Sequence, residues 1–166
     1  MRALCILALA ALLTGCNHAP TFPAPSANEL TLYRAAFTSI LKEANHPFNI
    51  ADTTDPFEPE TRGDDHCLKD LEIPTTPTHT RHKLPPETFA GLPVHLIDPG
   101  TRNFKQAVKQ GVLYFSEIAY NPAHTRAAFS YGFYCGGLCG GGAVVIFDLN
   151  HGQWTQSATR CNEWIS

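Results

Sequence analysis

The spacing of apolar residues changes along the chain and divides it into two parts. Between residues 28 and 44, apolar side chains recur every three or four positions, which predicts an amphipathic helix with one apolar face. From Val112 onward the apolar residues recur with a period of two, which is typical of strands. This second part predicts four strands, at residues 112–120, 126–135, 143–149 and 153–165.

Capping and turn residues support these boundaries. Ser26 followed by Glu29 fits a capping box at the start of the helix, with Asn28 as a competing N-cap. Short turns at residues 121–124 and 150–152 separate consecutive strands, which is the pattern of an antiparallel meander. One face of such a sheet can bury the apolar face of the helix. We therefore expect an α+β fold in which the N-terminal amphipathic helix packs on a four-stranded antiparallel meander.

Aromatic residues on the predicted strands indicate which side chains meet. Trp154 and Trp164 have the same parity in the last strand, so we expect both rings on one face of the sheet. Core packing is the favoured role for them, and an aromatic surface for a ligand or partner is the alternative. Aromatic–aliphatic pairs between two neighbouring strands are expected from Phe129, Tyr131 and Phe133 with Val144 and Ile146.

A polar, proline-rich stretch at residues 53–86 separates the two patterned parts. So long a segment without periodicity is unusual inside a compact domain, and we expect it to be held in place through Cys67. Its few apolar residues are Phe57, Leu68, Leu71, Ile73 and Leu84. Shorter elements are expected around it, namely an edge strand at 48–52, helical turns at 86–92, a strand at 94–97 and a helix at 101–110.

The start of the chain has the features of an export signal. A basic residue, Arg2, precedes an apolar run at residues 3–13 that is shorter than the roughly 20 residues needed to span a bilayer. The run ends in Leu-Thr-Gly-Cys, which resembles the lipobox of bacterial lipoproteins. This resemblance implies cleavage before Cys16, a diacylglycerol on its thiol and an acyl chain on its new amino terminus. An ordinary signal peptide with a chance cysteine is the alternative.

The expected organisation follows from this signal. We expect a lipoprotein signal peptide at residues 1–15, a lipidated cysteine and proline-rich tether at 16–27, and a single α+β domain at 28–166. Asn17 follows the lipidated cysteine where sorting signals for the inner membrane carry Asp. By the same resemblance, the protein is expected in the outer membrane of the cell envelope, facing the periplasm.

The charge of the chain limits the partners that we expect. Lys and Arg number 12 against 15 Asp and Glu, for a formal net charge of −3, and no basic patch stands out. This argues against nucleic acid and against electrostatic attraction to anionic lipid. The acyl chains are therefore expected to make the membrane contact, and the remaining partner is an envelope protein or a small ligand.

Four cysteines remain once Cys5 leaves with the signal peptide and Cys16 is lipidated. An even number in an oxidising compartment predicts disulfides, with three possible connectivities for Cys67, Cys135, Cys139 and Cys161. Cys135 and Cys139 have three intervening residues in a predicted hairpin loop. Redox-active pairs usually have two and lie at a helix N-terminus, so we favour a structural disulfide here. That leaves Cys67 with Cys161, although a swapped pairing stays open.

The sequence also contains residues that could serve metal binding, phosphate binding or acid/base catalysis. His66, His79 and His82 invite a metal site, but zinc prefers paired ligands on ordered elements, so no metal and no cofactor are expected. The glycine-rich run at residues 136–142 lacks the Lys and Ser/Thr of a phosphate loop and precedes a strand instead of a helix. An acid/base pair formed by Glu117 and Glu163 is conceivable, but we assign them to solvated sheet edges and expect no catalytic residue.

The C-terminal third also resembles a family of uncharacterised bacterial envelope lipoproteins. The family shares a C-terminal pattern of a Ser, a short strand and a turn, then Tyr-Cys-Gly-x-Leu-Cys-Gly-x-Gly, a strand, Gly-x-Trp, and Trp-(Ile/Val)-Ser. The matching positions are Ser116, Tyr134, Cys135, Gly136, Leu138, Cys139, Gly140, Gly142, Gly152, Trp154, Trp164, Ile165 and Ser166. The chain departs from the family at Gln153, where a basic residue is commoner, and in having Cys67 and Cys161. The resemblance bears on the fold and implies no settled activity.

Taken together, these patterns favour a lipid-anchored, periplasm-facing envelope protein that acts as a non-catalytic binding or structural module. The alternative is a thiol-redox or metal-assisted envelope enzyme that uses Cys135 and Cys139, or the region of His66, His79 and His82.

Overall fold

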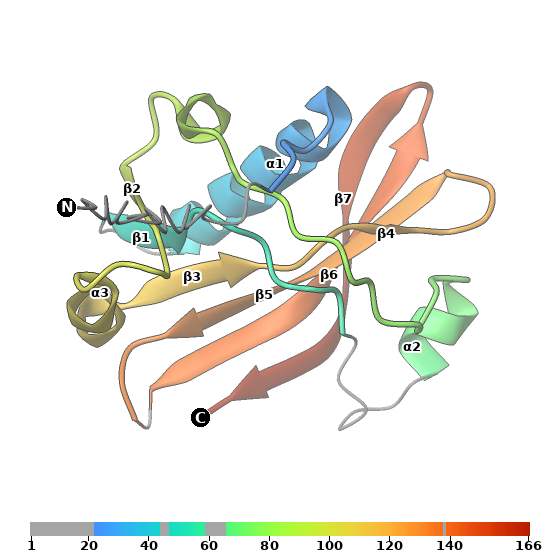
Figure 1. The fold of residues 1–166 in the computed structure, drawn as a ribbon. Coiled ribbons are helices and arrows are strands. Elements are labelled where there is room, and N and C mark those ends of the chain that lie inside the picture. Colours follow the sequence, from blue (N-terminus) through green and yellow to red (C-terminus); the bar gives the residue numbers. More distant parts are fainter. Residues whose placement is uncertain (1–21, 44–46, 59–65, 138) are drawn as a thin grey trace, which may run out of the picture.

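The computed structural model describes residues 22–43, 47–58, 66–137 and 139–166. Within these residues the chain forms one seven-stranded sheet in the order β2-β1-β3-β5-β6-β7, with the short strand β4 paired to β5 (Figure 1). The strands are β1 (Phe48–Ala51), β2 (Val94–Ile97), β3 (Val112–Phe115), β4 (Ala119–Tyr120), β5 (Arg126–Tyr134), β6 (Gly140–Asn150) and β7 (Gln153–Ile165).

The predicted four-stranded antiparallel meander is wrong, because the sheet is larger and mixed. β1 runs parallel to both β2 and β3, whereas β3, β4, β5, β6 and β7 are joined by antiparallel pairs. β1 is therefore an inner strand and not the expected edge strand. β1 and β2 have four residues each, which is too short for a period to be read from sequence. The expected strand at 112–120 is also divided, because residues 116–118 lie between β3 and β4.

The helix α1 (Ala27–Glu43) covers one face of the sheet, which we call the first face (Figure 1). Its N-terminus is capped as the sequence predicts, because the backbone N–H of Ser26 donates to Glu29 Oε2 at 2.7 Å. Leu32, Tyr33 and Phe37 of α1 are buried against the sheet. Their partners in this core include Ile50, Leu113, Phe115, Phe129 and Phe147.

The opposite face, which we call the second face, is only partly covered. The short helix α2 (His66–Asp70) packs over β5, β6 and β7, with Leu68 and Ile73 buried beside Val144 and Ile146. The helix α3 (Phe104–Gln110) covers the β1–β3 end. A 3-10 helix, η1 (Pro86–Phe89), instead joins the core of the first face through Phe89.

Two disulfides involve the four cysteines that were predicted to pair. Cys67 of α2 is bonded to Cys161 of β7, with the Cα atoms 5.9 Å apart. This bond attaches the proline-rich stretch to the second face of the sheet. Cys135 is bonded to Cys139 with a Cα–Cα distance of 5.1 Å, across the loop that joins β5 to β6.

The tether and the domain meet closer to the N-terminus than expected. Pro25 is buried, and the carbonyl of Pro23 accepts a hydrogen bond from the backbone N–H of Lys83 at 2.9 Å. Residues 23–25 therefore pack on the domain. The predicted signal peptide and Cys16 lie outside the described residues. Among those described, none of the helices combines the length and the apolar composition needed to cross a bilayer.

The register of the long hairpins differs from the sequence-based expectation. Phe129 lies opposite Val145, and Tyr131 opposite Ala143, so Val144 and Ile146 face the other side of the sheet and the predicted pairs are wrong. The two tryptophans also fall on opposite faces. Trp154 packs on the core of the first face, whereas Trp164 packs against Tyr134 on the second face.

Irregular pairing of β7 with β6 explains the separation of the tryptophans. Between Gly142 and Val144, β7 has one extra residue, and between Val145 and Phe147 it has two more. An odd total reverses the direction of the side chains along β7.

Candidate ligand-binding site

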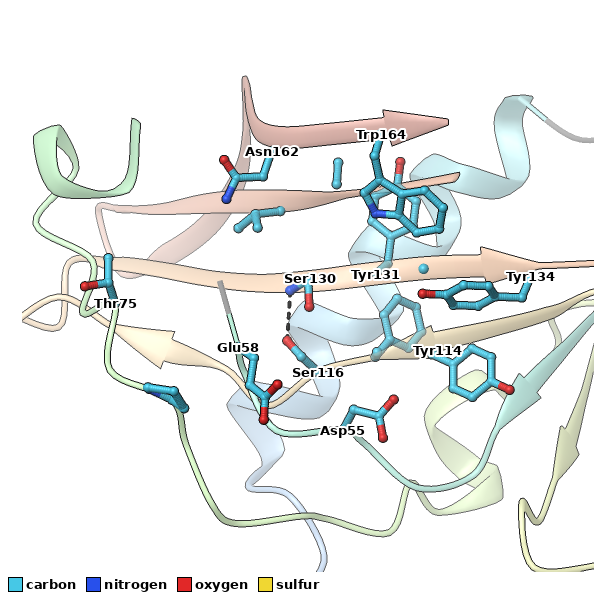
Figure 2. Close-up of a pocket in the computed structure, with 15 residues that line it drawn as sticks. Asp55, Glu58, Thr75, Tyr114, Ser116, Ser130, Tyr131, Tyr134, Asn162 and Trp164 are labelled. Carbon is cyan, nitrogen blue, oxygen red and sulfur yellow. Dashed lines mark hydrogen bonds between the residues drawn. The ribbon is translucent and has the colours of Figure 1, made fainter. Parts of the chain in front are cut away.

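The uncovered part of the second face forms a half-open cavity with a volume of about 710 Å³ (Figure 2). Its floor is made by β3, β5, β6 and β7, including Ser130, Gly132 and Val144. One wall is the extended segment after β1, which contributes Asp55 and Glu58. The chain that follows α2 contributes the remaining wall at Thr75 and Pro77.

Three aromatic rings from different strands lie along one end of this cavity (Figure 2). Tyr134 of β5 is central. Its ring centroid lies 5.5 Å from that of Tyr114 on β3, at an interplanar angle of 83°. The Trp164 ring on β7 lies 5.5 Å from Tyr134 on the other side, at 41°. The three rings are therefore mutually inclined and form a corner in place of a single flat surface.

Glycines on the neighbouring strands make room for these rings. A Cβ placed on Gly142 of β6 would lie 2.8 Å from Nε1 of Trp164, and one on Gly140 would lie 3.3 Å from its Cζ3. The indole therefore lies close over the backbone of β6, where it lines the cavity. A Cβ on Gly132 would likewise approach Cε2 of Tyr134 at 3.0 Å. Gly140 and Gly142 thus leave room for the Trp164 ring, and Gly132 for the Tyr134 ring, because glycine has no side chain.

Two carboxylates, those of Asp55 and Glu58, line the same cavity as the rings. Burial raises the pKa of Asp55 above its ordinary value of 3.8, the nearby Arg81 lowers it, and the nearby Glu58 carboxylate raises it further. Asp55 Oδ1 lies 3.5 Å from Nη2 of Arg81, with both side chains about half exposed. Burial, followed by the charge of Asp55, also raises the pKa of Tyr114 to about 12. The acidic wall and the aromatic end of the cavity therefore interact electrostatically.

Backbone pairing holds the acidic wall against the sheet. The N–H of Asp55 donates to the carbonyl of Phe115 at 2.9 Å, and the N–H of Glu117 donates to the carbonyl of Asp55 at 2.7 Å. Directly beneath the wall, the buried carboxylate of Glu117 accepts a hydrogen bond from the Thr54 hydroxyl and lies 2.6 Å from Nδ1 of His82. The segment that carries Asp55 is thus fixed by both backbone and side-chain contacts.

The serines in the floor are also held in place. Ser116 Oγ accepts a hydrogen bond from the backbone N–H of Ser130 at 2.8 Å (Figure 2). The same hydroxyl donates to the carbonyl of Glu117 at 2.9 Å. The carbonyl of Ser116 accepts from the Tyr33 hydroxyl of α1 at 2.9 Å. Burial raises the pKa of Tyr33 well above its usual range, so this hydroxyl remains a donor. The floor of the cavity is therefore fixed before any ligand arrives.

The other candidates that the sequence raised are not brought together. Within the described part of the chain, no group of three His, Cys, Asp or Glu residues has the arrangement of a metal site. His82 is occupied with Glu117, while His66 and His79 are exposed. Glu117 is buried and not on a solvated edge, whereas the side chain of Glu163 is 63% exposed and lies 3.7 Å from Arg160.

Sequence reasoning did not find the acidic wall or Tyr114. Asp55 and Glu58 lie in the stretch judged polar and irregular, and Tyr114 lies within a predicted strand. The signal that the sequence offered was Tyr134 together with Trp164, two aromatic residues of the C-terminal pattern described above. Comparisons of this chain with protein-family models, curated proteins and solved structures find no match.

Proposed function

We propose that this protein is a lipid-anchored, periplasm-facing binding module of the bacterial envelope, and that its ligand occupies the cavity on the second face. The observation that carries the proposal is one cavity lined both by the aromatic corner of Tyr114, Tyr134 and Trp164 and by the carboxylates of Asp55 and Glu58. Ligand pockets typically have volumes of about 300–1,000 Å³ and combine apolar rings with a few fixed polar groups. The cavity falls within this range.

The rigidity of the cavity supports binding as its role. The floor and the acidic wall are already held by hydrogen bonds of Ser116, Ser130 and Glu117. A preformed site loses less entropy when a ligand binds, which favours affinity. The two disulfides suit an oxidising compartment such as the periplasm. The Leu-Thr-Gly-Cys sequence before the domain supports anchoring through acyl chains on Cys16.

The anchor is tested by Cys16→Ser. Because processing at the lipobox needs Cys16, the variant is exported behind an ordinary cleavable signal peptide in place of residues 1–15. We expect the unsubstituted protein in the membrane fraction of cells that express it and the variant in the soluble periplasmic fraction, because the acyl chains are the expected membrane contact. Continued membrane association of the variant would contradict lipid anchoring while leaving the cavity untouched.

The ligand site is tested with protein gently extracted from its native envelope and measured by native mass spectrometry. We expect a bound small molecule on the unsubstituted protein, and its loss in Trp164→Leu, because the cavity then lacks its largest ring. Trp154→Leu is the matched control, since Trp154 packs on the core of the first face, on the opposite side of the sheet from the cavity. A ligand retained equally by both variants, or no ligand on any of the three proteins, would contradict the proposed site.

A further inference from the structure

The walls of the cavity have a chemistry that is more specific than general ligand binding. The faces of Trp and Tyr rings carry partial negative charge and attract cations within about 6 Å of the ring centroid. Asp55 and Glu58 are the carboxylates that line the same cavity. Both kinds of group, the rings at one end and the carboxylates in the wall, favour a positively charged occupant.

The inclination of the rings separates this site from a flat stacking platform. A sugar ring stacks best on a single plane, whereas Tyr114 is turned 83° from Tyr134, and Tyr134 is turned 41° from Trp164. Rings that meet at such angles surround a compact group from more than one side. This is the arrangement that aromatic cages use for ammonium groups.

The charges of the acidic wall also favour a positively charged ligand. Glu58 contributes to the raised pKa of Asp55, so the two carboxylates repel each other within the same wall of the cavity. A cation placed between them relieves this repulsion. Arg81 does so only partly, because its Nη2 lies 3.5 Å from Asp55 Oδ1 with both side chains about half exposed, and Arg81 does not line the cavity. The wall therefore has negative charge available to a ligand.

We propose that the cavity binds the ammonium group of a small organic cation, with the rings of Tyr114, Tyr134 and Trp164 around it and the carboxylates of Asp55 and Glu58 as counter-charges. This inference rests on the proposed function and names its ligand class. Quaternary and primary ammonium groups share the required charge. The rings favour the quaternary form because it is weakly hydrated and has an apolar surface.

The test uses the same exported Cys16→Ser variant, which carries neither the acyl chains nor the apolar run at residues 3–13 and so needs no detergent. It is titrated with choline and with the neutral alcohol in which carbon replaces the choline nitrogen. Calorimetry gives the Kd, and tryptophan fluorescence reports on the aromatic corner. We expect choline to bind about tenfold or more tightly than its neutral isostere, and to bind more weakly as salt is added. Equal affinity for the two compounds would overturn the inference.

Matched variants place the binding in this cavity. Glu58→Gln should weaken choline binding several-fold, while Glu163→Gln, which changes an exposed carboxylate outside the cavity, should leave it unchanged. Arg81→Gln should strengthen binding because it removes a competing cation from Asp55. Trp164→Leu should abolish the fluorescence response. Choline binding that survives Trp164→Leu and Glu58→Gln would also overturn the inference.

The same titrations distinguish failure of the ammonium inference from failure of the proposed binding function. The neutral sugar N,N′-diacetylchitobiose is the comparison ligand. If it binds more tightly than choline, and if Trp164→Leu weakens its binding, the ammonium inference fails and the proposed binding module stands. If neither compound binds and native protein carries no ligand, both fail.

Discussion

Nδ1 of His82 lies 2.6 Å from Oε2 of Glu117, a residue 35 positions further along the chain. Both side chains are largely buried, at 18% and 6% exposure. The other oxygen of the same carboxylate accepts from the Thr54 hydroxyl, and Thr54 Oγ1 in turn accepts from the backbone N–H of His82 at 2.8 Å. Three segments that are distant in sequence are thus joined around one buried carboxylate, directly under the acidic wall of the cavity.

We expect Glu117→Ala to lower the free energy of unfolding by about 3 kcal/mol, because it leaves the Thr54 hydroxyl and His82 without their buried partner. Glu163→Ala is the control. Its carboxylate is 63% exposed, and a change at such a surface position usually stays within about 0.5 kcal/mol. Urea denaturation measures both variants. Similar effects of the two substitutions would show that the buried cluster contributes little.

The two disulfides should differ in their contribution to stability. The Cys67–Cys161 bond closes a loop of 94 residues, and the Cys135–Cys139 bond joins positions only four apart. In the chain-entropy description a longer loop restricts the unfolded chain more. Replacing Cys67 and Cys161 by Ala should therefore cost about 4 kcal/mol, and replacing Cys135 and Cys139 about 1–2 kcal/mol. Denaturation without reductant compares the two double variants.

A thiol count accompanies that experiment. On denatured protein that lacks Cys5 and Cys16, we expect no free thiol before reduction and four after it. Free thiols in protein isolated directly from cells, with its thiols blocked at lysis, would contradict the structural role of these disulfides and would favour redox chemistry instead.

The raised pKa of Asp55 predicts a pH dependence of stability. Because burial is its main cause, the folded protein binds a proton at Asp55 more tightly than the unfolded chain does. The stability due to the protonated form is fully present below about pH 3.8 and is lost as the pH rises through the folded-state pKa. Asp55→Asn cannot ionise, so its stability relative to the unsubstituted protein should increase over this range.

Urea denaturation from pH 3 to pH 7 checks this expectation, with Glu163→Gln as the control. The effect should be small, since the Asp55 side chain is half exposed and Arg81 lies 3.5 Å away. A stability difference that shrinks as the pH rises would mean that the Arg81 contact outweighs burial.

Local patterns in the sequence predicted the elements that have enough length to show a period. The apolar spacing of α1 marks the face that is buried on the sheet, with Tyr33 and Phe37 almost completely covered. The few apolar residues of the proline-rich stretch are also the ones that hold it, since Phe57, Leu68 and Leu84 are almost completely buried. In such a segment, each isolated apolar side chain is a contact with the core.

The sheet order and the cavity could not be predicted in this way. β1 and β2 join the sheet in parallel through four-residue strands, whose partners are set by tertiary packing and not by periodicity. The cavity combines Asp55, Tyr114 and Trp164, which only the folded sheet brings together. Extra residues in β7 also move Trp164 to the second face, and bulges of this kind leave no mark in a pattern of alternation.

The Trp164 ring lies close over β6 because Gly142 has no side chain. A Cβ at this position would lie 2.8 Å from Nε1 of Trp164 and would also overlap the carbonyl oxygen of Tyr131. Because the second contact is with backbone, it cannot be relieved by a rotamer change. Gly142→Ala should therefore lower the free energy of unfolding by about 1–3 kcal/mol and lift the indole from the strand, with a shift in its fluorescence. Gly137→Ala is the matched control, since a Cβ at Gly137 meets no atom within 4 Å. If both substitutions are tolerated equally, Gly142 is not needed to seat the ring, and the aromatic corner must be held by Tyr114 and Tyr134 instead.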